Sequence, residues 1–437
     1  MEIVIKAAQF ILSLSFLIVL HELGHFIPAK IFKTRVEKFY LFFDYKFSLV
    51  KKKVGETVYG IGWIPLGGYV KISGMIDESM DTEQMKQPAQ PWEFRSKPAW
   101  QRLIIMLGGV IVNFVLGILI YIMITFVYGI DFVKPEDVKE GFAVHETFKQ
   151  YGFKDGDKIT KFNGSEPLDV TDVNKHLFLR DITSLDVIHS DGKSESIDIP
   201  ENIGEIMWEN GVMQPFSVRM PAVIDTVIVE SPADKAGFLK NDKILSVDNT
   251  PIVYWNEFTN LVVSSEGDMT ISVERDGITK NITLKADEDK KIGVAPNRAN
   301  ILNIQHKNYS LLESISKGNS IAIWTLKDYI TQFKYVFTKK GATSIGGFIA
   351  IGNIFPATWS WQAFWSITAF LSIMLGFMNL LPIPALDGGH VMFTLYEIVT
   401  GRKPNDKFLE YAQVTGFILL IALLLLANGN DIVKLFS

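Results

Sequence analysis

Long apolar runs constrain this chain most, because such runs must be buried in a lipid bilayer or in a large core. The first run, Ala7 to Leu20, leads directly into His21-Glu22-Leu23-Gly24-His25. Further apolar runs cover residues 103–128 and 361–381, and a shorter one covers residues 414–427. We therefore expect a multi-pass α-helical membrane protein with four transmembrane helices.

The charged cluster after the first run predicts a hydrolytic zinc site. His21 and His25 are four residues apart, so on a helix both lie on one face and can bind the same ion. Glu22 could take a proton from a zinc-bound water. An ionisable cluster at membrane depth is a functional hypothesis by default. The alternative is that the helix ends at Leu20 and the cluster merely sits at the membrane interface.

Composition limits the donors that such a site can use. The 437 residues include no cysteine, which excludes disulfides and thiolate ligands, so a metal must be held by histidine and carboxylate. The formal net charge of −5 does not suggest nucleic acid as a partner.

Charge and chain breakers predict the topology. Residues 29–102 are rich in lysine and arginine, so this loop is expected on the cytoplasmic side and the N-terminus outside. No small-residue cleavage site follows the first run, which indicates a retained helix, ended by Pro28, rather than a signal peptide. By alternation, residues 129–359 lie outside the membrane, and the basic link around Arg402 is cytoplasmic.

Two features near the membrane leave alternatives open. Residues 56–72 read as glycine-broken strands of a hairpin, which is either an edge for an extended peptide or an ordinary amphipathic hairpin on the membrane surface. Asn113 is the one strongly polar side chain of the second run. It serves either helix packing or the active site.

The polar middle of the chain contains an internal repeat. Residues 153–164, FKDGDKITKFNG, recur as residues 238–249, FLKNDKILSVDN. With the Ser-Pro-Ala helix start at Ser231, residues 223–284 resemble a bacterial, circularly permuted PDZ domain, an α+β fold. The first copy, residues 141–200, lacks that helix start. The following stretch, residues 311–337, is amphipathic and suits a membrane surface, with packing against the PDZ pair as the alternative.

Asp387 is the candidate third ligand. It follows Pro382 and Pro384, which are expected to unwind the backbone around a polar cavity. By topology it approaches the depth of the histidine pair from the opposite direction. The alternatives are a simple turn role in Asp-Gly-Gly and ligation by His390 instead.

These motifs together resemble the site-2 protease family of intramembrane zinc metalloproteases. The resemblance rests on the histidine motif, the loop at residues 64–71, two PDZ copies and the Asn379 to Gly388 segment. It implies Zn²⁺ held by His21, His25 and Asp387, with Glu22 as catalytic base and Asn379 as a catalytic group that holds the substrate backbone or its oxyanion. It implies substrate binding by Gly67, Gly68, Tyr69, Pro382 and Pro384.

The resemblance also implies the protein's setting. The expected place is a bacterial inner membrane, with the PDZ domains in the periplasm. The expected partners are lipid, an upstream site-1 type protease, and single-span membrane proteins such as anti-sigma factors or signal-peptide remnants. The expected transmembrane helices cover residues 1–28, 103–128 and 413–430, and a third transmembrane region with the Leu-Asp-Gly motif covers residues 361–398. The other expected segments are a cytoplasmic-side loop with a membrane-associated β-hairpin at 29–102, a PDZ-like domain at 129–220, a PDZ domain at 221–298, an amphipathic connector at 299–360 and a cytoplasmic link at 399–412.

Two departures from the family pattern concern local backbone geometry. The second run reads Gly109-Val110 where the family commonly has Gly-Pro, and residues 347–350 read Gly-Phe-Ile-Ala where it has Gly-Pro-Ile-Gly. Two other functional classes fit the sequence less well. A membrane-anchored PDZ scaffold leaves Glu22 unexplained, and a metal transporter lacks a polar relay to the opposite leaflet.

Overall fold

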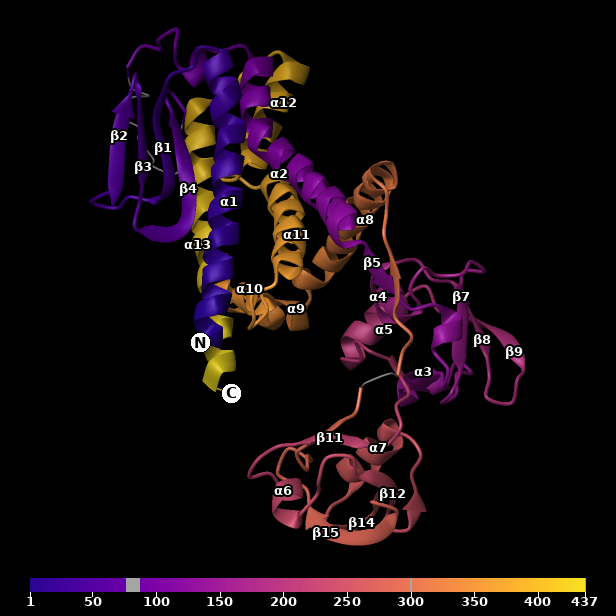
Figure 1. Ribbon diagram of the computed structural model, residues 1–437. Helices are drawn as coiled ribbons and strands as arrows, with labels where there is room; N and C mark the ends of the chain where they lie inside the picture. The colour runs from indigo at the N-terminus through magenta and orange to yellow at the C-terminus, as the bar shows by residue number, and fades with distance from the viewer. Residues whose placement is uncertain (76–86, 299–300, 437) are drawn as a thin grey trace. The chain divides into compact units, whose positions relative to one another are not determined.

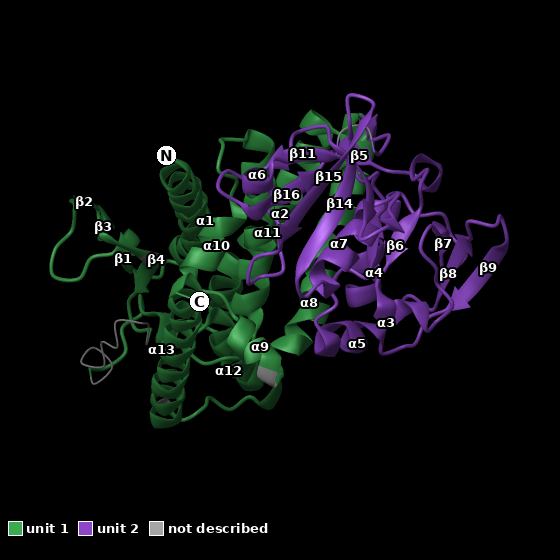
Figure 2. Cartoon of the chain, turned by 90° about the horizontal axis from the view of Figure 1, so that it is seen from below, with its two compact units in different colours: residues 1–129, 308–437 green, residues 130–307 purple. Residues whose placement is uncertain are grey.

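The computed structural model describes residues 1–75, 87–298 and 301–436, without the side chains of residues 66, 339 and 406 (Figure 1). The chain forms two compact units, one from residues 1–129 and 308–437 and one from residues 130–307 (Figure 2). The predicted boundary between the second PDZ domain and the connector falls between residues 298 and 299, and residue 299 lies outside the described residues.

Unit 1 is built on long apolar helices. Within the described residues, four helices are long and apolar enough to cross a membrane. They are α1 (Glu2–Ile31), α2 (Ala99–Tyr128), α11 (Trp361–Leu380) and α13 (Asp406–Phe436). Both chain termini lie at one end of this unit and α12 (Asp387–Thr400) lies at the other (Figure 1). The chain is therefore a multi-pass membrane protein.

The helices α1 and α13 extend beyond their predicted ends. The helix α1 does not end at Pro28 but continues to Ile31, because the Pro28 carbonyl still accepts a hydrogen bond from the Phe32 N–H at 2.9 Å. A proline removes only its own N–H from the helix ladder. The helix that contains the predicted fourth span, residues 413–430, continues beyond it at both ends, since α13 has 31 residues.

The loop after α1 forms a four-stranded sheet rather than the predicted hairpin. Its strands are β1 (Val36–Phe43), β2 (Val50–Val54), β3 (Thr57–Ile61) and β4 (Ile64–Ile72), in the order β2-β3-β1-β4. The strands β3 and β4 follow each other in the chain, but β1 lies between them, parallel to β3 and antiparallel to β4. This pairing joins distant segments, which local alternation of residues cannot reveal. It leaves β4 as an edge strand.

The sheet packs on α1 through aromatic contacts. The Phe26 ring of α1 meets the rings of Phe39 and Tyr59, with centroids 5.5 Å and 6.0 Å apart. The strand β4 approaches α1 closely at Gly68, where an added Cβ would meet the Ile18 side chain. The edge strand therefore runs directly beside the helix that carries the histidine pair.

Three helices connect unit 2 to α11. They are α8 (Leu311–Phe333), α9 (Lys339–Ser344) and α10 (Phe348–Ile354). The helix α8 packs on α2, where a Cβ at Gly318 would lie 2.6 Å from the Ile122 Cα, and the Tyr329 ring contacts Phe370 and Phe377 of α11. The amphipathic stretch thus packs on transmembrane helices.

Unit 2 contains two copies of one arrangement of strands and helices. The first copy runs β6 (Phe142–Val144), α3 (Glu146–Lys149), β7 (Lys158–Phe162), α4 (Val173–Leu179), β8 (Ser184–Ile188), β9 (Ser194–Asp198), an added α5 (Ile203–Asn210) and β10 (Phe216–Val218). The second runs β11 (Ile224–Val227), α6 (Pro232–Ala236), β12 (Lys243–Val247), an added β13 (Thr250–Pro251), α7 (Trp255–Ser264), β14 (Asp268–Arg275), β15 (Ile278–Lys285) and β16 (Val294–Pro296).

Strand pairing repeats between the copies. In each, the first and last strands pair antiparallel, and the three middle strands form a meander, β7-β8-β9 or β12-β14-β15. The strands β5 (Ile130–Phe132) and β17 (Gln305–Lys307) pair where the chain enters and leaves the unit. The repeat seen in the sequence is therefore a repeat of structure.

Each copy buries one aspartate immediately before the first meander strand. Asp157 and Asp242 are both 0% exposed. Asp157 contacts Nδ1 of His189 at 2.7 Å, whereas Asp242 accepts two hydrogen bonds of 2.7 Å from Arg275. The strand registers place His189 and Arg275 at equivalent positions. The two copies thus pair the same buried carboxylate with different basic side chains.

Candidate metal centre

The helices α1 and α2 meet at glycines: Gly24, between the two histidines of α1, lies against Gly108 and Gly109 of α2. A Cβ at Gly24 would lie 2.6 Å from the Gly108 carbonyl carbon, so both positions require the absence of a side chain. At the neighbouring Gly109, a Cβ would lie 2.6 Å from Cε1 of His21 and closer still to Nε2 of His25. The close approach of the helices therefore places the backbone of α2 against both imidazoles.

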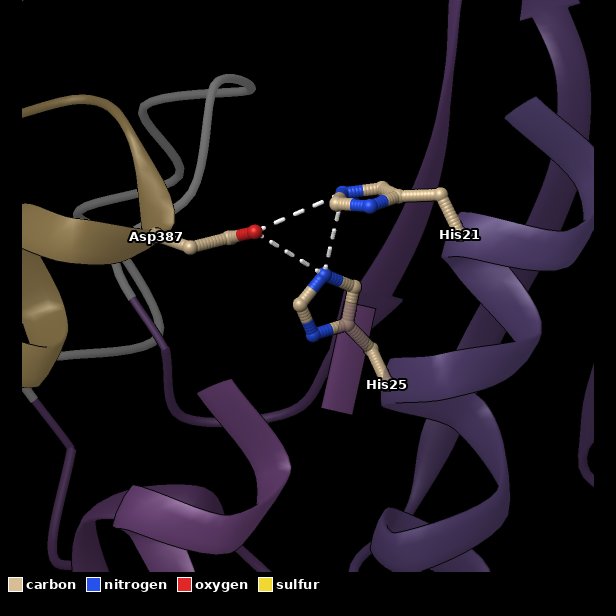
Figure 3. Close-up of side chains that lie close together, drawn as sticks. All are labelled: His21, His25 and Asp387. Atoms are coloured by element: carbon tan, nitrogen blue, oxygen red, sulfur yellow. Dashed lines mark hydrogen bonds and ion pairs between the residues drawn. The ribbon is translucent and has the colours of Figure 1, made fainter. Parts of the chain in front are cut away.

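Three side-chain donor atoms converge beside this contact (Figure 3). Nε2 of His21 lies 3.3 Å from Nε2 of His25, and Oδ2 of Asp387 lies 3.4 Å and 3.3 Å from these two nitrogens. The two histidines come from α1 and Asp387 from the first turn of α12. A tetrahedral zinc site with bonds of about 2.0–2.1 Å separates neighbouring ligands by about 3.3 Å. The triangle of donors matches one face of such a site.

The chemistry of these donors also fits a divalent zinc ion. Oδ2 of Asp387 is buried and has no hydrogen-bond donor among the described residues, so its charge faces only the two imidazole nitrogens. Two imidazole nitrogens and one carboxylate oxygen are a usual set of three protein ligands in catalytic zinc sites, which leave the fourth position open.

The outer ring nitrogens of both histidines are held by α2. Nδ1 of His25 lies 2.8 Å from the Ile105 carbonyl oxygen, and Nδ1 of His21 lies 3.0 Å from the side-chain amide of Asn113. Such contacts fix ring orientation and leave Nε2 of each ring directed at the metal position. The sequence left two roles open for Asn113, helix packing or the active site. The direct contact with His21 favours a role at the active site.

A pocket of about 100 Å³ opens beside the three donors. Its wall includes Glu22 and His25 of α1, Gly68 and Tyr69 of β4, and Asp387. The Glu22 carboxylate interacts with the backbone N–H of Val70, also in β4. The pocket therefore brings together a carboxylate, the edge strand and the candidate metal ligands.

Asn379 lies at the end of α11, beside the same centre. Its side-chain amide nitrogen is 3.3 Å from Nε2 of His21, so it is adjacent to the metal position. His390 follows Asp387 by one helical turn and lines the pocket, where its Nε2 contacts the Gln413 amide at 2.6 Å. His390 is not one of the three residues whose donor atoms converge within the described chain.

The residues expected to bind substrate fall into two places. Gly68 and Tyr69 line the pocket, although the Tyr69 hydroxyl donates a 2.7 Å hydrogen bond to Asp44, which anchors that side chain in the sheet. Pro382 and Pro384 line a separate groove against α13. Gly67 adjoins Gly68 on β4 and faces the Phe43 ring, 3.0 Å from where its Cβ would be.

At both departures from the family pattern the structure shows a specific local contact. Gly109 leaves room for the histidines, and it was not singled out as a site residue, although paired glycines in an apolar helix signal close helix contact. At the second departure, the N–H groups of Ile349 and Ala350 each donate a 3.0 Å hydrogen bond to Asp431 of α13. That segment therefore attaches the fourth span to α10.

Comparison with known proteins gives matches over nearly the whole chain. The profile described as "Peptidase family M50" matches residues 9–423. The chain is 28% identical to "Regulator of sigma E protease" of Haemophilus influenzae and 28% identical to "Regulator of sigma-E protease RseP" of Escherichia coli, over 98% of both chains in each comparison. It is 27% identical to the Salmonella typhimurium protein of the latter name, over 100% of both chains.

Proposed function

The chain belongs to peptidase family M50 and is a zinc metalloendopeptidase of the site-2 type, and from that premise we propose that it cleaves peptide bonds within transmembrane segments of single-span membrane proteins. The observation that carries this proposal is the donor triangle of His21, His25 and Asp387, with separations of 3.3–3.4 Å. We assign these three residues as the zinc ligands. A bound zinc ion would polarise the scissile carbonyl and lower the pKa of water toward about 7.

Glu22 is the general base in this proposal. It follows His21 directly on α1 and lines the pocket beside the three donors. Its carboxylate accepts the proton of the attacking water and later delivers it to the leaving amide nitrogen, which departs as an amine. The amide of Asn379, adjacent to Nε2 of His21, donates a hydrogen bond to the oxygen of the scissile carbonyl as negative charge develops on it.

The edge strand β4 presents the substrate. A transmembrane helix satisfies its backbone polar groups internally, so its peptide bonds become accessible only after local unwinding. Pairing with the outer edge of β4 replaces part of the lost hydrogen bonding, and alternate side chains can then enter the pocket. Gly68 and Tyr69 contribute through their backbone, since the Tyr69 hydroxyl is engaged by Asp44.

The setting follows from charge and connectivity. We propose that the active site lies toward the cytoplasmic side of a bacterial inner membrane and that unit 2 lies in the periplasm, and the lysine- and arginine-rich loop between α1 and α2 supports this orientation. We propose anti-sigma factors or signal-peptide remnants as the substrate class, and the relatives named "Regulator of sigma E protease" support a role connected with sigma-E.

The two copies in unit 2 are proposed to be PDZ domains that restrict access. Their shared strand pairing and the Ser-Pro-Ala helix start of the second copy support this identification. We propose that they exclude proteins whose outer domain has not been trimmed by an upstream site-1 type protease. Deleting residues 141–287 should then permit cleavage of untrimmed reporters. If the deleted enzyme cleaves trimmed reporters but still rejects untrimmed ones, the size-filter role is wrong.

The proposed activity is tested with a trimmed single-span reporter and purified full-length protein in detergent. We expect cleavage by the wild type, loss on zinc chelation, and recovery when zinc is restored. Glu22→Gln should retain zinc but lose cleavage, whereas Glu2→Gln, an exposed change on the same helix, should leave turnover unchanged. Near-normal turnover by zinc-loaded Glu22→Gln would refute the assignment of the base.

A further inference from the structure

Asn113 is an unusual residue for its position in the middle of α2. Its side chain lies in an apolar helix and is 0% exposed. Among the described residues, its only side-chain hydrogen-bond contact is Nδ1 of His21, at 3.0 Å. The other polar atom of the amide, Oδ1, is buried without a partner in the same part of the chain. Half of this amide is therefore unsatisfied.

A residue selected only for packing would avoid this arrangement. An amide buried with an unpaired polar atom is destabilising relative to an apolar side chain of similar volume. The neighbouring surface offers no other reason for the amide, since Gly376 and Ser372 approach its Cβ and its backbone carbonyl rather than its polar end. The feature that requires a polar group at this site is the His21 imidazole.

The chemistry of the zinc site proposed above specifies the role of Asn113, and that role rests on the proposed function. Each imidazole directs Nε2 to the metal, so each Nδ1 carries the proton and needs an acceptor. The Ile105 carbonyl oxygen is that acceptor for His25, at 2.8 Å. For His21 the group in that position is the amide of Asn113.

We propose that Asn113 is a positioning residue for His21, accepting the Nδ1–H hydrogen bond through its amide oxygen. The two ends of an amide have nearly the same shape, so a half-turn about the last side-chain bond puts Oδ1 where Nδ2 lies. The tautomer and the ring plane of His21 are then set by α2. Without this contact the ring can rotate about its Cβ–Cγ bond, and Nε2 leaves the corner of the donor triangle.

The assignment makes α2 the frame of the metal site. One ligand is oriented by a backbone carbonyl at Ile105 and the other by a side chain at Asn113, two turns further along the same helix. A backbone acceptor survives any substitution, whereas a side-chain acceptor does not. Of these two contacts to the outer ring nitrogens, only the one at residue 113 is therefore sensitive to substitution of a side chain.

The test measures zinc affinity rather than cleavage. The purified full-length protein, stripped of metal, is titrated with zinc against a competing chelator, and cobalt is bound in parallel to report ligand geometry through its visible spectrum. We expect Asn113→Leu to weaken zinc binding about 10- to 100-fold and to alter the cobalt spectrum. Asn113→Asp, which keeps an acceptor of the same length, should stay close to wild type.

A matched control is available in the same neighbourhood. The Ser372 hydroxyl donates a 2.7 Å hydrogen bond to the backbone carbonyl of Asn113, so Ser372→Ala disturbs this region without touching His21. We expect its zinc affinity to equal that of the wild type. Thermal unfolding of the metal-free proteins completes the test, because a packing role predicts that Asn113→Leu loses stability even without zinc.

The outcomes separate this inference from the proposed function. Equal zinc affinities for wild type and folded Asn113→Leu would overturn the role of Asn113 while leaving the zinc site intact. Equal weakening by Asn113→Asp and Asn113→Leu would overturn it as well. If Asn113→Leu does not fold, the Asp and Ser372 variants still decide the question. If His25→Ala instead binds zinc as tightly as the wild type does, the metal site itself is refuted.

Discussion

Replacing Gly109 by alanine should strongly weaken zinc binding while leaving the membrane helices in place. The added Cβ would lie 2.6 Å from Cε1 and 2.8 Å from Nδ1 of His21, and closer still to Nε2 of His25. Ordinary contact begins at 3.4 Å, so the nearest His21 atom must retreat by about 0.8 Å, the difference between 3.4 Å and 2.6 Å. Both imidazoles are held at Nδ1 by α2, so neither ring can retreat without losing that contact.

A displacement of this size is large for a metal site. Ligand distances in functional sites hold to within about 0.2 Å, and a misplacement of about 1 Å in an active site costs about 100-fold. We therefore expect zinc affinity to fall at least about 100-fold, equivalent to about 2.8 kcal/mol. Overpacking adds a loss of stability of about 1–3 kcal/mol.

The assay is zinc titration of purified Gly109→Ala against a chelator, with thermal unfolding of the metal-free protein. Gly429→Ala is the control, because it adds the same methyl group to the long helix α13 where no atom lies within 4 Å. That variant should bind zinc as the wild type does and gain up to about 1 kcal/mol of stability. Wild-type zinc affinity in folded Gly109→Ala would show that the contact between α2 and the histidines does not position the donors.

The other predictions concern the edge strand and unit 2. Gly68→Ala places a Cβ 2.7 Å from the Tyr40 carbonyl oxygen and should reduce reporter cleavage at least about 10-fold with zinc affinity unchanged; loss of zinc instead would contradict a role confined to substrate. Arg275→Met leaves the buried Asp242 without its cation, and should destabilise the second copy by about 3–5 kcal/mol in proteolysis assays. The hydrogen bond to Asp157 raises the pKa of His189, which also contacts Glu195. The contribution of the His189–Asp157 contact to the free energy of unfolding is therefore complete below a pH of about 6.5, and it is lost as the pH rises through the pKa of His189 in the folded protein. His189→Arg should abolish that dependence in pH-resolved proteolysis of residues 141–218, and an unchanged pH profile would refute it.

Local patterns were sufficient for several parts of the molecule. The spacing of His21 and His25 sets two imidazoles on one helix face regardless of what surrounds the helix. The apolar runs predicted the four spans because the length of a bilayer-crossing helix depends only on its own residues. The repeat at residues 153–164 and 238–249 predicted two similar folding units, since equal local sequences favour equal turns and strands.

Only the tertiary structure decided how those parts combine. The position of β1 between β3 and β4 and the contact of Gly109 with both histidines depend on segments far apart in the chain. Asn113 was visible in the sequence as a polar residue in an apolar run, but its partner was not. The reason is physical: periodicity and length describe a segment and its face, whereas packing selects which faces meet and at what distance. The donor triangle of His21, His25 and Asp387 is the outcome of both, with two corners placed by one helical turn and the third brought in by the fold.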